Sequence, residues 1–265
     1  MSASVLDSAA IARHGAELHA ALRSGVAVEP LSERIPGLGL ADAYAISNDL
    51  LARRLADGER VVGKKIGATS VAVQRMLKVD QPDFGFLTDR MQVANGGVLA
   101  TAGMIAPRAE GEIAFHLKRD LVGPGITHHD VLAATEALSV CFEIVDSRIR
   151  DWRIGITDTV ADNASAAAYV LGELRVPPKN LDLGTLGMVV EKNGELVATG
   201  AGAAALGSPV NCVAWLANTL GRLGTPLKAG EVILSGALVP LIPVAAGDHM
   251  RVRVGALGSA DIQFA

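Results

Sequence analysis

Apolar residues follow two different periodicities along the chain, and the change between them falls near residue 60. Before that point they recur every three to four positions in residues 7–24 and about 41–56, which is typical of amphipathic helices. The stretch 30–40 between them is rich in proline and glycine and predicts a loop. We therefore expect residues 1–60 to form a helical N-terminal arm or subdomain.

After residue 60, short apolar runs predict strands and only a few segments keep helical spacing. Strands are expected at 61–66, 111–118, 140–146, 186–192, 195–200, 231–235, 249–255 and 259–264, with helices near 129–138, 161–171 and 209–223. Thr69 and Ser70 are suited to cap a short helix, and Asn193-Gly194 predicts a hairpin. Residues 237–246 are interpreted as a buried strand with a turn. The pattern predicts an α+β protein with a β-rich catalytic domain at 61–265.

The amino-acid composition is consistent with the predicted α+β fold and excludes some classes of function. Half of the residues are apolar and a fifth are charged, as in ordinary globular proteins. The net charge of −4 and the 3% of aromatic residues argue against nucleic-acid binding. No run reaches the ~20 apolar residues of a membrane span, and the N-terminus does not resemble a signal peptide. Cys141 and Cys212 lie in apolar surroundings, which favours a cytoplasmic protein without disulfides.

Carboxylates are the strongest candidates for chemistry. In residues 107–115 (PRAEGEIAF), Glu110 and Glu112 share a face if the segment is a strand. Glu143 stands inside the apolar strand 140–146, where a charge is costly unless it is paired or bound to metal. Three carboxylates suit Mg²⁺ or Mn²⁺ better than Zn²⁺. The alternative is a solvated strand face for the first two glutamates, with Glu143 paired to an arginine such as Arg148.

Three other motifs have a simple structural interpretation as well as a functional one. Residues 63–70 (GKKIGATS) put two lysines on a strand, and alternation lets only one of Lys64 and Lys65 face a cleft. Residues 80–85 (DQPDFG) indicate a turn, and residues 162–165 (DNAS) indicate a helix cap. The glycines form neither a phosphate-binding loop nor a dinucleotide fingerprint, and no serine-hydrolase elbow is present.

Together and in this order, the motifs resemble a known family. Residues 63–70, 79–85, 107–115, 143–152 and 158–165 are similar to segments of the 2-keto-4-pentenoate hydratases (2-hydroxypenta-2,4-dienoate hydratases) of the fumarylacetoacetase superfamily. The resemblance covers nearly the whole chain from about residue 41. It implies a β-rich, mixed-sheet core of the fumarylacetoacetase C-terminal-domain type. Lys64 and Ala68 depart from the residues that are common in the family.

The resemblance also implies a reaction and the residues that perform it. The implied metal ligands are Glu110, Glu112 and Glu143, and the implied proton-transfer pair is Lys65 and Asp83. In the mechanism that follows from them, Thr69 or Ser165 is expected to bind the substrate by a hydrogen bond to its carboxylate. The metal would be Mg²⁺ or Mn²⁺, acting as a Lewis acid. The substrate would be a 2-hydroxy-2,4-dienoate from aromatic or steroid ring cleavage, hydrated through its 2-oxo-3-enoate to a 4-hydroxy-2-oxo acid. A cytoplasmic homo-oligomer is implied, as is a complex with a related decarboxylase or a downstream aldolase.

Three alternatives remain open at this point. A 4-oxalocrotonate-type decarboxylase would use the same chelation, and Asp83 is the residue that argues for the hydratase instead. An acylpyruvate hydrolase needs a base, usually a histidine near the acidic cluster, and none can be placed there from the sequence. A non-catalytic partner subunit of the decarboxylase would not need an intact Lys65 and Asp83 together with three glutamates.

Overall fold

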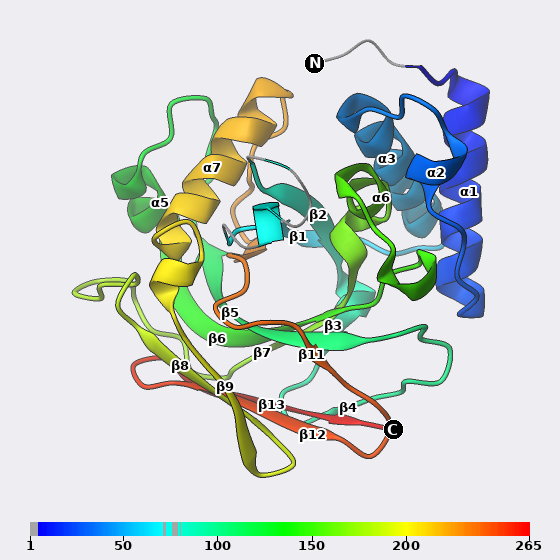
Figure 1. The fold of residues 1–265 in the computed structure, drawn as a ribbon. Coiled ribbons are helices and arrows are strands. Elements are labelled where there is room, and N and C mark those ends of the chain that lie inside the picture. The colour runs from blue at the N-terminus through cyan, green and yellow to red at the C-terminus, as the bar shows by residue number, and fades with distance from the viewer. Residues whose placement is uncertain (1–4, 71–72, 76–78, 80) are drawn as a thin grey trace.

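Two β-sheets packed face to face form the body of the protein, and helices flank the larger, curled sheet (Figure 1). The computed structural model describes residues 5–70, 73–75, 79 and 81–265. The sheets approach closely at Gly111, where a Cβ atom would lie 2.5 Å from the sulfur of Met188. Both inner faces contribute to one large apolar core. The α+β class with a mixed sheet and a helical N-terminal region is confirmed.

The larger sheet contains the strands that carry the candidate site. Its order is β2-β1-β10-β5-β6-β7-β3, with β11 paired to β5; these strands span Asp83–Thr88, Val61–Gly67, Val232–Leu234, Arg108–Leu117, Thr135–Val145, Ala166–Leu171, Gln92–Val93 and Ile242–Pro243. The smaller sheet has the order β4-β13-β12-β8-β9, with strands Val98–Leu99, Gly258–Phe264, His249–Val254, Gly187–Lys192 and Glu195–Ala201. Strand β1 runs parallel to β10, whereas β5 is antiparallel to both β10 and β6.

The helices begin and end where local chemistry favours it. They are α1 (Ser8–Ser24), α2 (Leu31–Arg34), α3 (Leu40–Ala56), α5 (His128–Ala134), α6 (Ile156–Ala161) and α7 (Pro209–Arg222), with 3₁₀ turns η1 (Asp89–Met91), η2 (Arg150–Trp152), η3 (Asn163–Ser165) and η4 (Gly202–Ala204). The Asp7 carboxylate caps α1 by accepting from the Ala10 N–H, and left-handed Gly25 ends it. Within the described residues, no helix has both the length and the apolar character needed to cross a bilayer.

The N-terminal helices pack against the segment that borders the site. Leu18, Ile46 and Leu50 belong to an apolar cluster that also contains Val160 of α6. On α3, the Tyr44 ring stacks on Phe84 of β2 with centroids 4.4 Å apart, directly beside the predicted site residue Asp83. The helical arm therefore supports the walls of the candidate site. A domain boundary at residue 60 stays a prediction.

Several predicted elements differ from the structure. The helix predicted at 161–171 is wrong, because α6 ends at Ala161 and residues 166–171 form β7 between β6 and β3. The alanine-rich stretch has helical propensity, but pairing inside the sheet overrides it. The helix predicted at 129–138 ends at Ala134, and β6 begins at once.

Two of the predicted loop and turn segments differ in detail from the structure, and the predicted hairpin is present. The loop expected at 30–40 contains the short helix α2, and only residues 242–243 of the strand expected at 237–246 are paired. The hairpin at Asn193-Gly194 is confirmed, with positive φ at both residues. Part of the helix predicted after Thr69, and Asp80 of the predicted turn, lie outside the described residues.

Candidate active site

Three buried glutamates come together on the face of the larger sheet that is turned away from the smaller sheet. Glu110 and Glu112 alternate with glycine on β5, and Glu110 stands directly opposite Glu143 of β6. One carboxylate oxygen from each of the three lies within 4.8 Å of the others. Their relative exposures are 9%, 0% and 0%. The sequence prediction that Glu110 and Glu112 share a face with Glu143 nearby is confirmed, and the solvated-face alternative is wrong.

The cluster lacks the hydrogen bonds that would neutralise it within the described residues. Glu112 Oε2 accepts a hydrogen bond of 2.7 Å from the Gly236 N–H, but Glu112 Oε1 and both Glu143 oxygens accept none. Burial, followed by the neighbouring Glu143 carboxylate, raises the pKa of Glu110 to about 8. The pKa of Glu112 is raised well above its usual value for the same two reasons, with Glu110 adding to them. Hard oxygen donors whose combined negative charge exceeds that of the neighbouring cation, Lys65, fit a hard divalent cation.

Lys65 projects from β1 into this cluster. Its Nζ lies 3.3 Å from Glu143 Oε1 and donates a 3.0 Å hydrogen bond to the Ala164 carbonyl. Burial alone would lower the pKa of Lys65, but the surrounding carboxylates, Glu143 first, raise it above the usual lysine value. Lys64 points to the other face and pairs with Glu231. The prediction that only one of the two lysines enters the cleft is confirmed.

Asp83 begins β2 and faces the same space as Lys65. Its side chain is 3% exposed, and burial raises its pKa while the Lys65 charge lowers it. Asp83 pairs with Gly67 of β1, where an added Cβ would lie 2.2 Å from Asp83 Oδ1 and 3.2 Å from Lys65 Nζ. Only glycine leaves room for both groups to converge. Gly67 was not singled out by the sequence, since its role is to provide empty space.

A strained turn completes this side of the site. Asn163, Ala164 and Ser165 all have positive φ, of 53°, 49° and 57°, a conformation that costs energy in residues other than glycine. The Asn163 amide side chain holds the turn by accepting from the Phe86 N–H at 2.7 Å and donating to the Phe86 carbonyl at 3.0 Å. The turn aims the Ala164 carbonyl at Lys65. The interpretation of residues 162–165 as a helix cap is wrong.

A buried ion pair supports the turn from behind. Asp162 pairs with Arg148, whose guanidinium also donates to the Asp162 and Ala166 carbonyls. Arg148 therefore does not neutralise Glu143, and that alternative is wrong. The sequence missed Asn163 and this ion pair, because the contacts join residues that are distant in sequence or lie in an irregular turn.

Five of the seven predicted site residues line one cavity of about 660 Å³, and Glu112 and Glu143 lie buried next to Glu110 behind its wall. Its polar side contains Lys65, Asp83, Glu110, Thr69 and Ser165. Thr69 and Ser165 are 4% and 3% exposed, and Ser165 Oγ has no hydrogen-bond partner among the described residues. The apolar part of the lining includes residues 237–241. A ligand with one polar end and a short apolar chain matches this lining.

Comparison with known proteins identifies the family. The sequence pattern of the fumarylacetoacetate (FAA) hydrolase C-terminal family matches residues 64–265. The chain belongs to the fumarylacetoacetate hydrolase family. Among its curated members, a 2-hydroxyhexa-2,4-dienoate hydratase of Comamonas testosteroni is 55% identical over 260 residues, which are 97% of this chain and 98% of that protein. A 2-hydroxypent-2,4-dienoate hydratase of Pseudomonas putida is 60% identical over 220 residues, 83% of this chain and 99% of that one.

A solved member of the family shares the whole fold. The 4-oxalocrotonate decarboxylase of Pseudomonas putida G7, complexed with magnesium and adipate, superposes with a TM-score of 0.96 at 36% identity. The match covers 99% of this chain and 100% of that one. The family resemblance noted in the sequence and the fumarylacetoacetase-type fold are both confirmed.

Proposed function

We propose that the protein is a divalent-metal-dependent hydratase that converts a 2-hydroxy-2,4-dienoate into a 4-hydroxy-2-oxo acid. The observation that carries this proposal is a cluster of three buried carboxylates that meets Lys65, at a cavity lined by Lys65, Asp83 and Glu110. Curated relatives at 55% and 60% identity are named as hydratases of 2-hydroxydienoates, which supports the proposal. An enzyme with this activity is a hydro-lyase. Its proposed place is the meta-cleavage catabolism of aromatic compounds or steroids.

Glu110, Glu112 and Glu143 would hold the metal, with Mg²⁺ or Mn²⁺ as the proposed ion. The cluster fits the ion because its charges are buried and three of its oxygens have no hydrogen-bond donor within the described residues. The related decarboxylase was solved with magnesium and also with calcium, which supports a divalent cation. Bound there, the cation supplies Lewis acidity and a template for the oxygens of a 2-oxo acid.

Lys65 and Asp83 form the proposed proton-transfer pair. Hydration first needs a proton on the terminal carbon of the dienol, which gives the 2-oxo-3-enoate. Water then adds its hydroxyl to C4 and a hydrogen to C3. Lys65 is the group that supplies or orients protons along the chain, and Asp83 positions or deprotonates the water. Thr69 and Ser165 would donate hydrogen bonds to substrate oxygens, since both hydroxyls line the cavity.

The second candidate function is 4-oxalocrotonate decarboxylation, which the close structural match to that enzyme favours. Asp83 and the hydratase relatives support hydration instead. A non-catalytic partner subunit is a third candidate, and the intact set of five site residues argues against it. The homo-oligomeric state, a complex with a decarboxylase or an aldolase, and a cytoplasmic location stay predictions.

Product identification tests the proposal. We expect freshly generated 2-hydroxypenta-2,4-dienoate to lose its ultraviolet absorbance in the presence of the metal-loaded protein, with a product heavier by one water in the mass spectrum. The control is 4-oxalocrotonate, from which we expect no release of CO₂. Release of CO₂ without hydration would establish the decarboxylase instead, and no turnover of either compound would favour the partner subunit.

A further inference from the structure

Arg108 lines the cavity, yet its charge has no partner among the described residues. No hydrogen bond or ion pair joins its guanidinium to any of them, including Asp151, which lines the same cavity. Three other buried cations in the described part of this region are paired: Lys65 with Glu143, Lys64 with Glu231 and Arg148 with Asp162. A half-buried arginine that faces a substrate cavity and is not paired with a carboxylate of the described residues is a candidate for binding an anionic group of the substrate.

Trp152 fixes the position of this cation. The guanidinium carbon of Arg108 lies 4.4 Å from the centroid of the indole ring. The ring is itself held, because Trp152 Nε1 donates a 3.0 Å hydrogen bond to the Ala106 carbonyl. This cation–π contact holds the guanidinium without using its N–H groups as hydrogen-bond donors to any described residue, so they are available for a planar acceptor.

Arg108 stands at one end of a row of site residues on β5. Side chains of alternate residues share a face, so Arg108, Glu110 and Glu112 follow one another along the strand. The row continues to Ala114, which pairs with Leu234 of β10, and Leu234 in turn pairs with Lys65 of β1. The two glutamates of β5 therefore lie between Arg108 and the level of the Lys65 backbone, and the Lys65 side chain reaches from there to Glu143.

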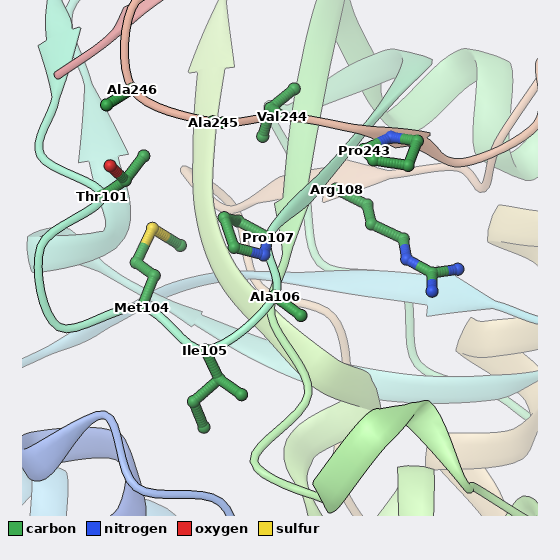
Figure 2. A pocket seen from close by; sticks show the side chains of 10 residues that line it. All are labelled: Thr101, Met104, Ile105, Ala106, Pro107, Arg108, Pro243, Val244, Ala245 and Ala246. Atoms are coloured by element: carbon green, nitrogen blue, oxygen red, sulfur yellow. The ribbon is translucent and has the colours of Figure 1, made fainter.

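A neighbouring hollow of about 410 Å³ also includes Arg108 among its lining residues. The other lining residues are uncharged and mostly apolar, for example Met104 and Val244. Figure 2 shows that the guanidinium end of Arg108 extends away from Thr101 and Met104. The charge of Arg108 is therefore directed away from this hollow.

We propose that Arg108 binds the carboxylate of the substrate through a paired, charge-assisted hydrogen bond. The carboxylate would lie at the Arg108 end of the row, and the carbon chain would pass the glutamate cluster toward Lys65 and Asp83, where protons are transferred. This orientation rests on the proposed function and adds to it a residue that selects 2-oxo acids over their neutral amides or esters. The contact with Trp152 holds the arginine in place before the substrate binds.

A binding experiment that needs no turnover tests this inference. The ligands are 2-oxopentanoate, which has no double bond to hydrate, and its neutral amide, titrated calorimetrically into the Mg²⁺-loaded protein. We expect Arg108→Gln to weaken binding of the acid about 10- to 100-fold, because a buried charge-assisted pair is lost, and to leave the weak binding of the amide unchanged. The affinity of Arg108→Lys for the acid should lie between those of the wild type and Arg108→Gln, because lysine keeps the positive charge but lacks the planar guanidinium.

The controls separate this inference from folding, metal binding and the proposed function. Arg60→Gln removes an exposed arginine paired with Asp89 and should bind the acid as the wild type does. The affinity of Arg108→Gln for Mn²⁺, measured by electron paramagnetic resonance, should be unchanged. The inference is overturned if Arg108→Gln keeps the wild-type preference for acid over amide, or if acid and amide weaken equally. The two proposals can also fail separately. If Arg108→Gln loses the preference for acid over amide but the wild type does not hydrate dienoates, the carboxylate site stands and the hydratase function is rejected.

Discussion

Glu112→Gln is expected to abolish the thermal stabilisation that Mg²⁺ or Mn²⁺ gives the protein and to lower hydration at least about 100-fold. Glu112 is fully buried, and its Oε1 has no hydrogen-bond partner among the described residues. We assign this oxygen to the metal. Glutamine keeps the size of the side chain and can still accept the hydrogen bond from Gly236, but it lacks the charge that attracts the cation.

The melting temperature of Glu112→Gln without metal distinguishes a metal ligand from a structural residue. Burial and the charges of Glu143 and Glu110 raise the pKa of Glu112, which means that the ionised form is costly in the folded protein. Removing that charge should leave the melting temperature of the metal-free protein unchanged or higher. Glu195→Gln, on the exposed face of β9, is the control and should behave as the wild type. A variant that melts well below the wild type without metal would indicate a structural role for Glu112.

Asp83→Asn is expected to lower the hydration rate about 10²- to 10⁴-fold while metal affinity stays close to that of the wild type. Asp83 lies outside the three-glutamate cluster, but it faces Lys65 across the space that Gly67 leaves open. Asparagine fills the same volume and cannot accept a proton from water. Steady-state rates and Mn²⁺ titrations on the same preparations measure the two effects separately.

A parallel loss of rate and metal affinity would contradict this role for Asp83. It would mean that the carboxylate organises the cluster rather than the water. A matched variant is available on the same strand pair, because Lys64 forms an ion pair with Glu231 on the other face of β1. Lys64→Met should change stability more than it changes the ratio of hydration rate to metal affinity.

Strand alternation explains why so much of the site could be predicted from the sequence. A period of two residues places Glu110 and Glu112 on one face and separates Lys65 from Lys64, whatever the rest of the fold does. The position of Glu143 in an apolar run indicated a buried, functional carboxylate. These inferences depend only on local geometry, and the structure confirms the arrangement. The roles given to the residues came from family resemblance and stay predictions.

The features that were missed depend on contacts across the fold. Nothing local distinguishes the alanine-rich strand β7 from a helix, because its conformation is set by the strands on both sides. The turn at Asn163 looked like a helix cap, yet its side chain bonds to Phe86, 77 residues away. Arg148 was close in sequence to Glu143 but pairs with Asp162. The partner of a buried charge is therefore set by the tertiary structure and not by proximity in the sequence.

One titration tests the central claim, that the glutamate cluster holds a single divalent cation on which hydration depends. Metal-stripped protein would be titrated with Mn²⁺ while bound ion, by electron paramagnetic resonance, and loss of 2-hydroxypenta-2,4-dienoate are followed in the same samples. The predicted result is no hydration without metal and a linear recovery that stops at one ion per chain, with no recovery in Glu112→Gln. Full hydration by the stripped protein would contradict the claim.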